Sequence, residues 1–343
     1  MIHPFGTLED GRRVDAVSLG AADGLQVEVL SYGAILRRIT CPVRGRRREL
    51  ILSFASLDEY VRDRAYVGPM VGRFGNRISE SRFTIDGRES RVTANEGVNH
   101  LHGGALGFGK RLWNIDEAHD HRLVLTYRSP AGEEGYPASM DVTAAFTVTA
   151  DTLTILLSAG SDAPTPVNLT YHPYFNLAAD KAGSATAHWL RIPAAHYLPV
   201  RDGLIPTGEV APVGGSAFDF RKSRILAPPP VAGEAQLTLA GGYDHCWVMS
   251  KDADCSCELI SPERDLMMTL RGSGPGLQFY NGQYLPRTHA TLGSGLILEP
   301  QGFPNAPNEP KFPPAILRPG ELYRAELEYR FTVPGEESGE SHG

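Results

Sequence analysis

The sequence predicts an all-β fold, an antiparallel sandwich or barrel with few, short helices. Short apolar runs recur along the 343 residues, and 37 glycines and 26 prolines are spread between them. Short strands that alternate with turn-forming residues are typical of antiparallel β-proteins. A parallel α/β sheet would require an alternation of strands and helices. No such alternation is visible, so the antiparallel classes are favoured.

The predicted strands lie at near-regular spacing along the chain. Leu153, Ile155 and Leu157 alternate with Thr152, Thr154 and Leu156, which is the period of two that a half-buried strand requires. Two segments, 85–88 and 117–122, are typical of hairpin turns between such runs. The expected strands include residues 25–30, 50–54, 123–127, 140–149, 152–158, 236–239, 246–249 and 267–270.

Helical patterns are scarce, and the strongest covers residues 57–64. Ser56 stands where an N-cap is expected, and Asp58 and Glu59 fall in the first turn, where acidic residues are favoured. No Pro/Ser-rich linker and no internal repeat divides the chain. We therefore expect one domain over residues 1–334, followed by a polar, glycine-rich and flexible tail over 335–343.

Composition and charge exclude several classes of protein. The net charge of −7 gives no electrostatic help for binding nucleic acid or an anionic membrane. No apolar run approaches membrane-spanning length and no secretory signal is visible, so a cytoplasmic location is expected. The basic run at residues 44–48 is interpreted as a solvated hairpin tip. The four cysteines, Cys41, Cys246, Cys255 and Cys257, are interpreted as reduced structural thiols.

The segment 168–177, NLTYHPYFNL, places a histidine among β-forming and aromatic residues. Pro173 donates no backbone hydrogen bond and favours extended geometry at His172, so the strand should break at the histidine. Tyr171, Tyr174 and Phe175 are expected to surround it. Taken alone, a histidine in such a setting is more often a hydrogen-bonded core residue than a site residue.

Four further segments are too polar and too glycine-rich for ordinary strands. Polar groups at strand ends, beside glycines that allow a ligand close to the backbone, are how β-proteins form small-molecule sites. Each segment also has a structural interpretation, such as an Asx turn at Asp244 or a strand-end ion pair at Glu299. The segments are VGRFGNRI at 71–78, NHLHGG at 99–104, GGYDHCW at 241–247 and LEPQGFPN at 298–305.

The pair His100 and His102 also suggests a metal site, because His-x-His on a strand is typical of cupin metal centres. That pattern needs a glutamate shortly after the second histidine. Here glycine, alanine and leucine follow, and the next acid is Asp116. A metal site is therefore not expected.

Seven spaced motifs together resemble the aldose 1-epimerase (galactose mutarotase) family, in family order and from residue 31 to residue 320. They are GRFGNRI, NHLHGG, GEEGYP, NLTYHPYFNL, GYDHCWV, GLQFYNG and LEPQGFPNAPN. The resemblance implies one large antiparallel β-sandwich with an open cleft. It also implies an isomerase that interconverts the α and β anomers of a free aldose, as a monomer or homodimer.

The resemblance also implies roles for particular residues. Opening the ring of an aldose needs a base on the C1 hydroxyl and an acid on the ring oxygen, with no cofactor or metal. Glu299 falls on the position of the base and His172 on that of the acid, so Glu299 must be ionised and His172 able to donate a proton. The implied sugar-binding residues are Asn76, Arg77, His102, Tyr174, Asp244 and Gln278, whereas His100 and Arg73 are not implied as site residues.

Two positions beside the histidine depart from the family pattern. The family commonly has asparagine before this histidine and serine or threonine after it, where this chain has Tyr171 and Pro173. A bulky Tyr171 beside the site leaves the identity of the aldose open. Three alternatives remain: a catalytically silent sugar-binding protein, a relative of hexose-phosphate epimerases, and a glycosidase that uses Asp244 and Glu299 as its carboxylate pair.

Overall fold

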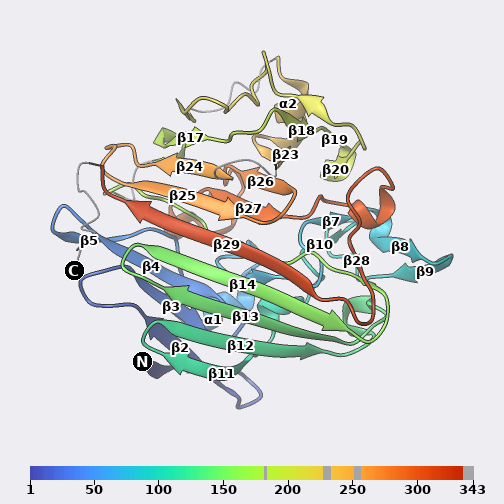
Figure 1. The fold of residues 1–343 in the computed structure, drawn as a ribbon, viewed down its shortest axis with the longest axis horizontal. Helices are drawn as coiled ribbons and strands as arrows, with labels where there is room; N and C mark the ends of the chain where they lie inside the picture. Colours follow the sequence, from blue (N-terminus) through green and yellow to red (C-terminus); the bar gives the residue numbers. More distant parts are fainter. Residues whose placement is uncertain (181–183, 227–232, 251–255, 335–343) are drawn as a thin grey trace.

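The computed structural model describes residues 1–180, 184–226, 233–250 and 256–334 (Figure 1). Within these residues the strands form three larger antiparallel sheets and several two-stranded pairs. In Figure 1, β11 to β14 lie in the lower half of the molecule and β17 and β24 in the upper half of the same nine-stranded sheet. The predicted all-β, antiparallel fold class is confirmed.

Each strand of the three larger sheets is hydrogen-bonded to the strands named before and after it. The first sheet contains β1 (Ile2–Thr7), β2 (Arg13–Leu19), β3 (Gln26–Leu30), β4 (Leu36–Val43) and β5 (Arg46–Glu49). The second contains β11 (Asn114–His119), β12 (Arg122–Ser129), β13 (Met140–Val148), β14 (Thr152–Ser161), β29 (Tyr323–Thr332), β25 (Met267–Gly272), β24 (Cys257–Ile260), β17 (Trp189–Arg191) and β22 (Arg224–Ile225). The third contains β21 (Ala211–Pro212), β18 (His196–Leu198), β23 (Asp244–Val248), β26 (Gly276–Tyr280) and β27 (Ile297–Gln301).

The remaining elements are short. The two-stranded pairs join β6 (Met70–Val71) to β16 (Thr170–Tyr171), β7 (Arg77–Ile78) to β10 (His100–Leu101), β8 (Arg82–Ile85) to β9 (Arg88–Arg91), β15 (Thr165–Pro166) to β28 (Ile316–Leu317), and β19 (Val200–Arg201) to β20 (Ile205–Pro206). The α-helices are α1 (Leu57–Arg62), α2 (Ala235–Ala240) and α3 (Leu285–Thr288). No helix of the described residues is both long and apolar enough to cross a membrane.

The hydrophobic core follows from the period-two pattern of the long strands. In β14, Leu153, Ile155 and Leu157 are fully buried, and Leu156 on the opposite face is exposed, as predicted. Val27 of β3 and Leu277 of β26 belong to the same core cluster as Ile155. All three larger sheets therefore contribute to one hydrophobic core.

Both predicted hairpins and the predicted helix are present. Residues 85–88 turn between β8 and β9, and residues 117–122 turn between β11 and β12. Helix α1 begins after Ser56, whose backbone N–H donates to the Glu59 carboxylate at 2.9 Å, as in a capping box. The helix ends at Arg62, two residues before the predicted end.

Two predicted strands are wrong. Residues 50–54 form only an isolated bridge, between Ile51 and Phe175. Residues 236–239 lie in helix α2, which buries Leu237 and Ala240 at helical spacing. This helix ends at Gly241, whose φ of 68° is the left-handed conformation in which glycine commonly closes a helix. An apolar alternation over four residues was too short to distinguish the two-residue period of a strand from the 3.6-residue period of a helix.

The basic run forms the tip of the β4–β5 hairpin, as predicted, but Arg48 is not solvated. Its guanidinium donates two hydrogen bonds of 2.7 Å to the carboxylate of Asp265. The Arg48 guanidinium lowers the pKa of Asp265 to about 2. Cys41, Cys246 and Cys257 are buried, whereas Cys255 and the predicted tail 335–343 lie outside the described residues.

Candidate active site

The polar, glycine-rich segments of the sequence converge on one cavity of about 340 Å³. His172 and Glu299 both line it. Five of the six predicted sugar-binding residues line it as well: Asn76, Arg77, His102, Tyr174 and Asp244. Gln278, the sixth, is not on the cavity wall. Its side-chain Nε2 donates to Oδ1 of Asp244 at 2.6 Å, so it holds a residue that is on the wall.

Short strand pairs bring the first three motifs together. Strand β7 pairs with β10, which places Arg77 opposite Leu101, one residue before His102. Strand β16 pairs with β6 and ends at Tyr171, so the strand breaks at His172, as the following proline predicts. Asn168 joins two further loops, because its side chain donates to the Gly75 carbonyl at 2.9 Å and accepts from the Gly302 N–H at 2.7 Å.

The third sheet supplies two of the carboxylates of the cavity, Asp244 and Glu299. Gln278 of β26 lies opposite Glu299 of β27 on one side and Cys246 of β23 on the other. Asp244 lies two residues before Cys246 on β23, and residues two apart on a strand share a face. Asp244, Gln278 and Glu299 therefore project from the same face of the sheet.

Arg77 is the central cation of the cavity. It forms two parallel hydrogen bonds with Glu96, of 2.6 Å from Nε and 2.8 Å from Nη2, and its Nη1 lies 3.6 Å from Oδ2 of Asp244. Burial lowers the pKa of Arg77, but the charges of Asp244 and Glu96 outweigh burial and raise it. Arg77 is thus a fixed positive charge between two acids.

His102 is held as a neutral ring. Its Nδ1 lies 3.2 Å from the backbone N–H of Asn76 and accepts from it, so the ring proton is on Nε2. Burial, and then the neighbouring His172, lower the pKa of His102 well below its usual value. His102 can therefore donate a hydrogen bond to a ligand without carrying a charge.

His172 lies in an aromatic corner of the cavity. Its ring centroid is 5.2 Å from that of His102, 5.3 Å from that of Tyr174 and 5.9 Å from that of Tyr66. Burial lowers the pKa of His172 to about 4, and the backbone carbonyl of Tyr66 offsets part of this shift. His172 is therefore neutral at pH 7 in the free protein.

The pKa of the Glu299 carboxyl group is raised, whereas that of His172 is lowered. Burial and the charge of Asp244 raise its pKa well above the usual value, and Arg77 offsets only part of the shift. Its Oε1 is buried and has no protein hydrogen-bond partner. In the free site both pKa shifts favour the neutral form of the group, whereas the mechanism expected from the sequence needs an ionised Glu299.

Two of the aromatic residues near His172 do not surround the cavity, contrary to expectation. Tyr171 points into the core, where its ring lies 5.9 Å from that of Phe146. Phe175 is buried 5.5 Å from the ring of Tyr329. Of the three aromatic residues expected to surround His172, only Tyr174 lines the cavity. Strand alternation accounts for Tyr171, because residues adjacent in an extended chain face opposite ways.

His100 and Arg73 have structural roles. Nδ1 of His100 donates to the Thr93 carbonyl at 2.7 Å, and its Nε2 accepts from the Tyr136 hydroxyl at 2.7 Å. Arg73 is buried and donates to the Ala138 carbonyl at 2.6 Å. Across the described parts of the chain, no three or more His, Cys, Asp or Glu side chains are grouped as a metal ion would need.

Several residues on the cavity wall were not predicted. Glu96 lies in the turn just before NHLHGG, and a carboxylate beside that motif was the one available signal. Tyr66 follows α1 in a loop with no recognisable motif. The wall residues not predicted are Arg64, Ala65, Tyr66, Glu96, Leu101, Leu204, Tyr280, Tyr284, Leu285 and Thr288.

Comparison with known proteins identifies the family of the chain. The chain is 37% identical to galactose mutarotase of Sus scrofa over 339 residues, which cover 96% of this chain and 97% of that protein. It is 35% identical to aldose 1-epimerase of Escherichia coli K12 over 335 residues, covering 94% and 96%. The crystal structure of galactose 1-epimerase from Lactobacillus acidophilus superposes with a TM-score of 0.86 at 26% identity, covering 97% and 98%. Residues 15–330 match the model of the aldose 1-epimerase family, and the chain belongs to that family.

Proposed function

We propose that this protein is an aldose 1-epimerase, an isomerase that interconverts the α and β anomers of a free aldose. The observation that carries the proposal is that His172 and Glu299 line one cavity together with Arg77, His102 and Asp244. This set supplies an acid, a base and hydrogen-bonding groups for sugar hydroxyls. The proposal assigns the activity to one domain over residues 1–334, in a cytoplasmic monomer or homodimer that needs no cofactor.

The reaction moves two protons and breaks one bond. Glu299 takes the proton of the C1 hydroxyl while His172 gives a proton to the ring oxygen, and the bond between C1 and that oxygen breaks. C1 becomes a carbonyl carbon, and rotation about the C1–C2 bond presents its other face to the C5 hydroxyl. His172 then takes the proton of the C5 hydroxyl, and Glu299 returns its proton to the carbonyl oxygen.

The directions of the two pKa shifts, raised for Glu299 and lowered for His172, support this cycle. A protonated Glu299 with a neutral His172 holds the same number of protons as an ionised Glu299 with a protonated His172. The state with protonated Glu299 and neutral His172 closes the ring, and the state with ionised Glu299 and protonated His172 opens it. The pair therefore needs one shared proton in total, and sugar binding has only to move it from Glu299 to His172. Such a pair titrates in two steps that belong to both residues.

The other wall residues have binding roles in this proposal. Asp244 accepts hydrogen bonds from sugar hydroxyls, strengthened by its charge. Arg77 and the Nε2–H of His102 stabilise the charge that develops at the ring oxygen. Tyr174 donates its hydroxyl proton to the Ala65 carbonyl at 2.9 Å, which leaves its oxygen free to accept from the sugar.

Polarimetry tests the function directly. The rotation of freshly dissolved α-D-glucose, α-D-galactose, xylose and arabinose should relax faster with the protein than without it. A preparation treated with a chelator should keep this activity, and activity that disappears and returns with zinc would contradict the cofactor-free mechanism. A sugar that binds in calorimetry but relaxes at the uncatalysed rate would favour a silent binding protein instead.

A further inference from the structure

We propose that Asp63 is a positioning residue, which holds loop 63–67 against the two histidines of the cavity, and that His289 ties this loop to helix α3. This inference rests on the proposed function for its kinetic consequences. Asp63 lies just after helix α1, is buried, and does not itself line the cavity. It therefore acts through the residues that it holds.

Asp63 binds the backbone on both sides of Tyr66. Its Oδ1 accepts from the Ala65 N–H and its Oδ2 from the Val67 N–H, each at 2.7 Å. Between these bonds Tyr66 has a φ of 58°, a left-handed conformation that bulky residues rarely adopt. Such a conformation persists only when the surroundings hold it. The two hydrogen bonds that the Asp63 carboxylate accepts stabilise this conformation of Tyr66.

The loop contacts three residues to which the proposed function gives roles. The ring of Tyr66 lies 4.7 Å from that of His102 and 5.9 Å from that of His172. The carbonyl of Ala65 accepts the hydroxyl proton of Tyr174 at 2.9 Å. The Tyr66 carbonyl also raises the pKa of His172 against the effect of burial. A displaced loop would thus change both the place and the proton affinity of His172.

The same carboxylate also contacts His289, next to helix α3. Nε2 of His289 lies 3.0 Å from Oδ1 of Asp63. His289 directly follows helix α3, and Leu285 and Thr288 of that helix line the cavity. Residues 64–66 line it from the loop that Asp63 holds. The Asp63–His289 pair therefore links two walls that are far apart in the sequence.

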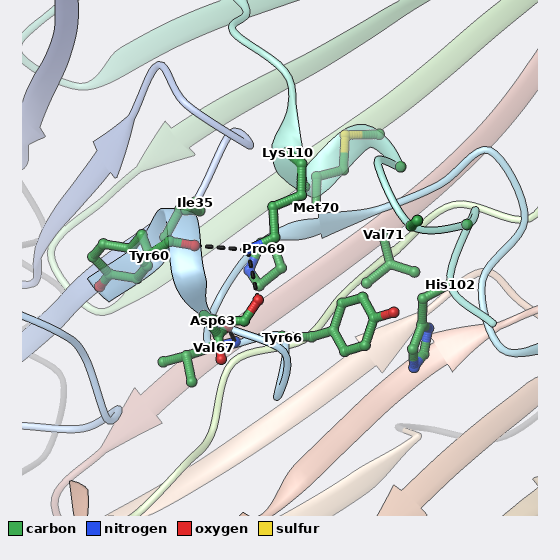
Figure 2. A pocket seen from close by; sticks show the side chains of 14 residues that line it. Ile35, Tyr60, Asp63, Tyr66, Val67, Pro69, Met70, Val71, His102 and Lys110 are labelled. Atoms are coloured by element: carbon green, nitrogen blue, oxygen red, sulfur yellow. Dashed lines mark hydrogen bonds between the residues drawn. The ribbon is translucent and has the colours of Figure 1, made fainter. Parts of the chain in front are cut away.

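Lys110 fixes the start of this loop, as Figure 2 shows. Its Nζ donates to the carbonyls of Tyr60 and Asp63, each at 2.7 Å, and to that of Val61 at 3.2 Å. In Figure 2, Tyr66 lies between this anchor and His102. The space beside them is only about 20 Å³, the size of a single water. The region is therefore a support for the cavity and not a second ligand site.

The test compares Asp63→Asn with Asp58→Asn. The first variant keeps the shape of the side chain, but its NH₂ group cannot accept from a backbone N–H, so one loop bond is lost. The control removes an exposed acid of α1 whose ion pair with Arg62 spans 3.8 Å. The ¹⁵N chemical shifts of the His172 imidazole at pH 7, assigned by their absence in His172→Asn, report its tautomer without any activity.

We expect Asp63→Asn to change those ¹⁵N shifts and to lower kcat/KM by roughly 10- to 100-fold, as displacements of about 1 Å near reacting groups do. The acid limb of its pH profile should move to lower pH, because the variant removes the charge of Asp63 and displaces the Tyr66 carbonyl, each of which raises the pKa of His172. Asp58→Asn should behave as wild type. Unchanged shifts and an unmoved acid limb, even with lower activity, would overturn the proposal, because a smaller folded fraction alone produces that result.

His289→Ala provides a second test if Asp63→Asn does not fold. It leaves both backbone hydrogen bonds of Asp63 and removes the link to α3 together with the ring contact of His289 to Phe54, so KM should rise several-fold while kcat changes little. An unchanged KM would overturn the link between the two walls. A wild-type protein that accelerates no aldose would refute the proposed function, while the ¹⁵N comparison would still decide whether Asp63 positions His172.

Discussion

Replacing Glu299 with glutamine should abolish most of the activity and, at the same time, make the protein more resistant to high pH. The glutamine keeps the shape of the side chain and its hydrogen-bonding groups but cannot take a proton. Burial and the charge of Asp244 raise the pKa of Glu299, so the free site favours the neutral carboxylic acid there. Glutamine is a close substitute for that neutral form, so the fold should tolerate it.

The two effects have different magnitudes and signs. Loss of the base should lower turnover by about 10²–10⁴, the usual contribution of general acid–base catalysis. Between the pKa of an unfolded glutamate and the higher folded pKa, the native state holds a proton that the unfolded state has lost. In this pH range the contribution of Glu299 to the free energy of unfolding falls as pH rises, by up to about 1.4 kcal/mol per pH unit. Glutamine removes this dependence, so the variant should gain stability relative to wild type as pH rises above the ordinary glutamate pKa of about 4.5.

The assay combines mutarotation rates with melting temperatures at several pH values. Glu9→Gln, which neutralises an exposed acid, is the matched control and should differ little from wild type in either measurement. A difference in Tm between Glu299→Gln and wild type that stays constant with pH would show that Glu299 ionises freely in the fold. Turnover near wild type would show that Glu299 is not the base.

The other residues of the site give three further predictions. His172→Asn should lower turnover by about 10²–10⁴ with an unchanged Tm, and rates near wild type would exclude His172 as the acid. Asp244→Ala should mainly raise KM, whereas Arg77→Ala should lower kcat as well, and steady-state kinetics would reveal the reverse. In Glu299→Gln, which lacks the opposing pH dependence of Glu299, Tm should fall as pH drops from about 6.5 to 4, because unfolding lets buried neutral histidines take up protons, whereas a Tm that rises in this window would contradict the lowered pKa values of His100, His102, His172 and His245.

The strands of the core were predictable because each carries its own pattern. The alternation in residues 152–158 depends on one buried face, and the structure buries the three residues that the pattern selects. Residues 50–54 and 236–239 are shorter than the alternating segment 152–158, so their apolar character did not specify a strand. Local sequence therefore predicts long amphipathic strands and fails for short apolar segments.

The cavity was predictable only where motifs mark it. His172, Glu299 and Asp244 each stand in a polar, glycine-rich or proline-broken segment that local reasoning can recognise. Tyr66 and Glu96 lie in ordinary loops, and they reach the cavity because Asp63 and Arg77 hold them there. Contacts across long stretches of sequence leave no local pattern. The orientation of Tyr171 was also missed, although strand alternation alone points it away from His172.

Burial is the largest cause of the raised pKa of Glu299, and the charges around Arg77 modify it. Asp244 raises the pKa of Glu299 and Arg77 lowers it, so the two residues oppose each other at the base. Glu96 holds Arg77 by two hydrogen bonds, and Arg77 lies 3.6 Å from Asp244. A sugar hydroxyl that donates to Asp244 would weaken its effect on Glu299, and the proton could then pass to His172 more readily. The residue proposed to bind the sugar would thereby also prepare the base, which links substrate binding to the state that opens the ring.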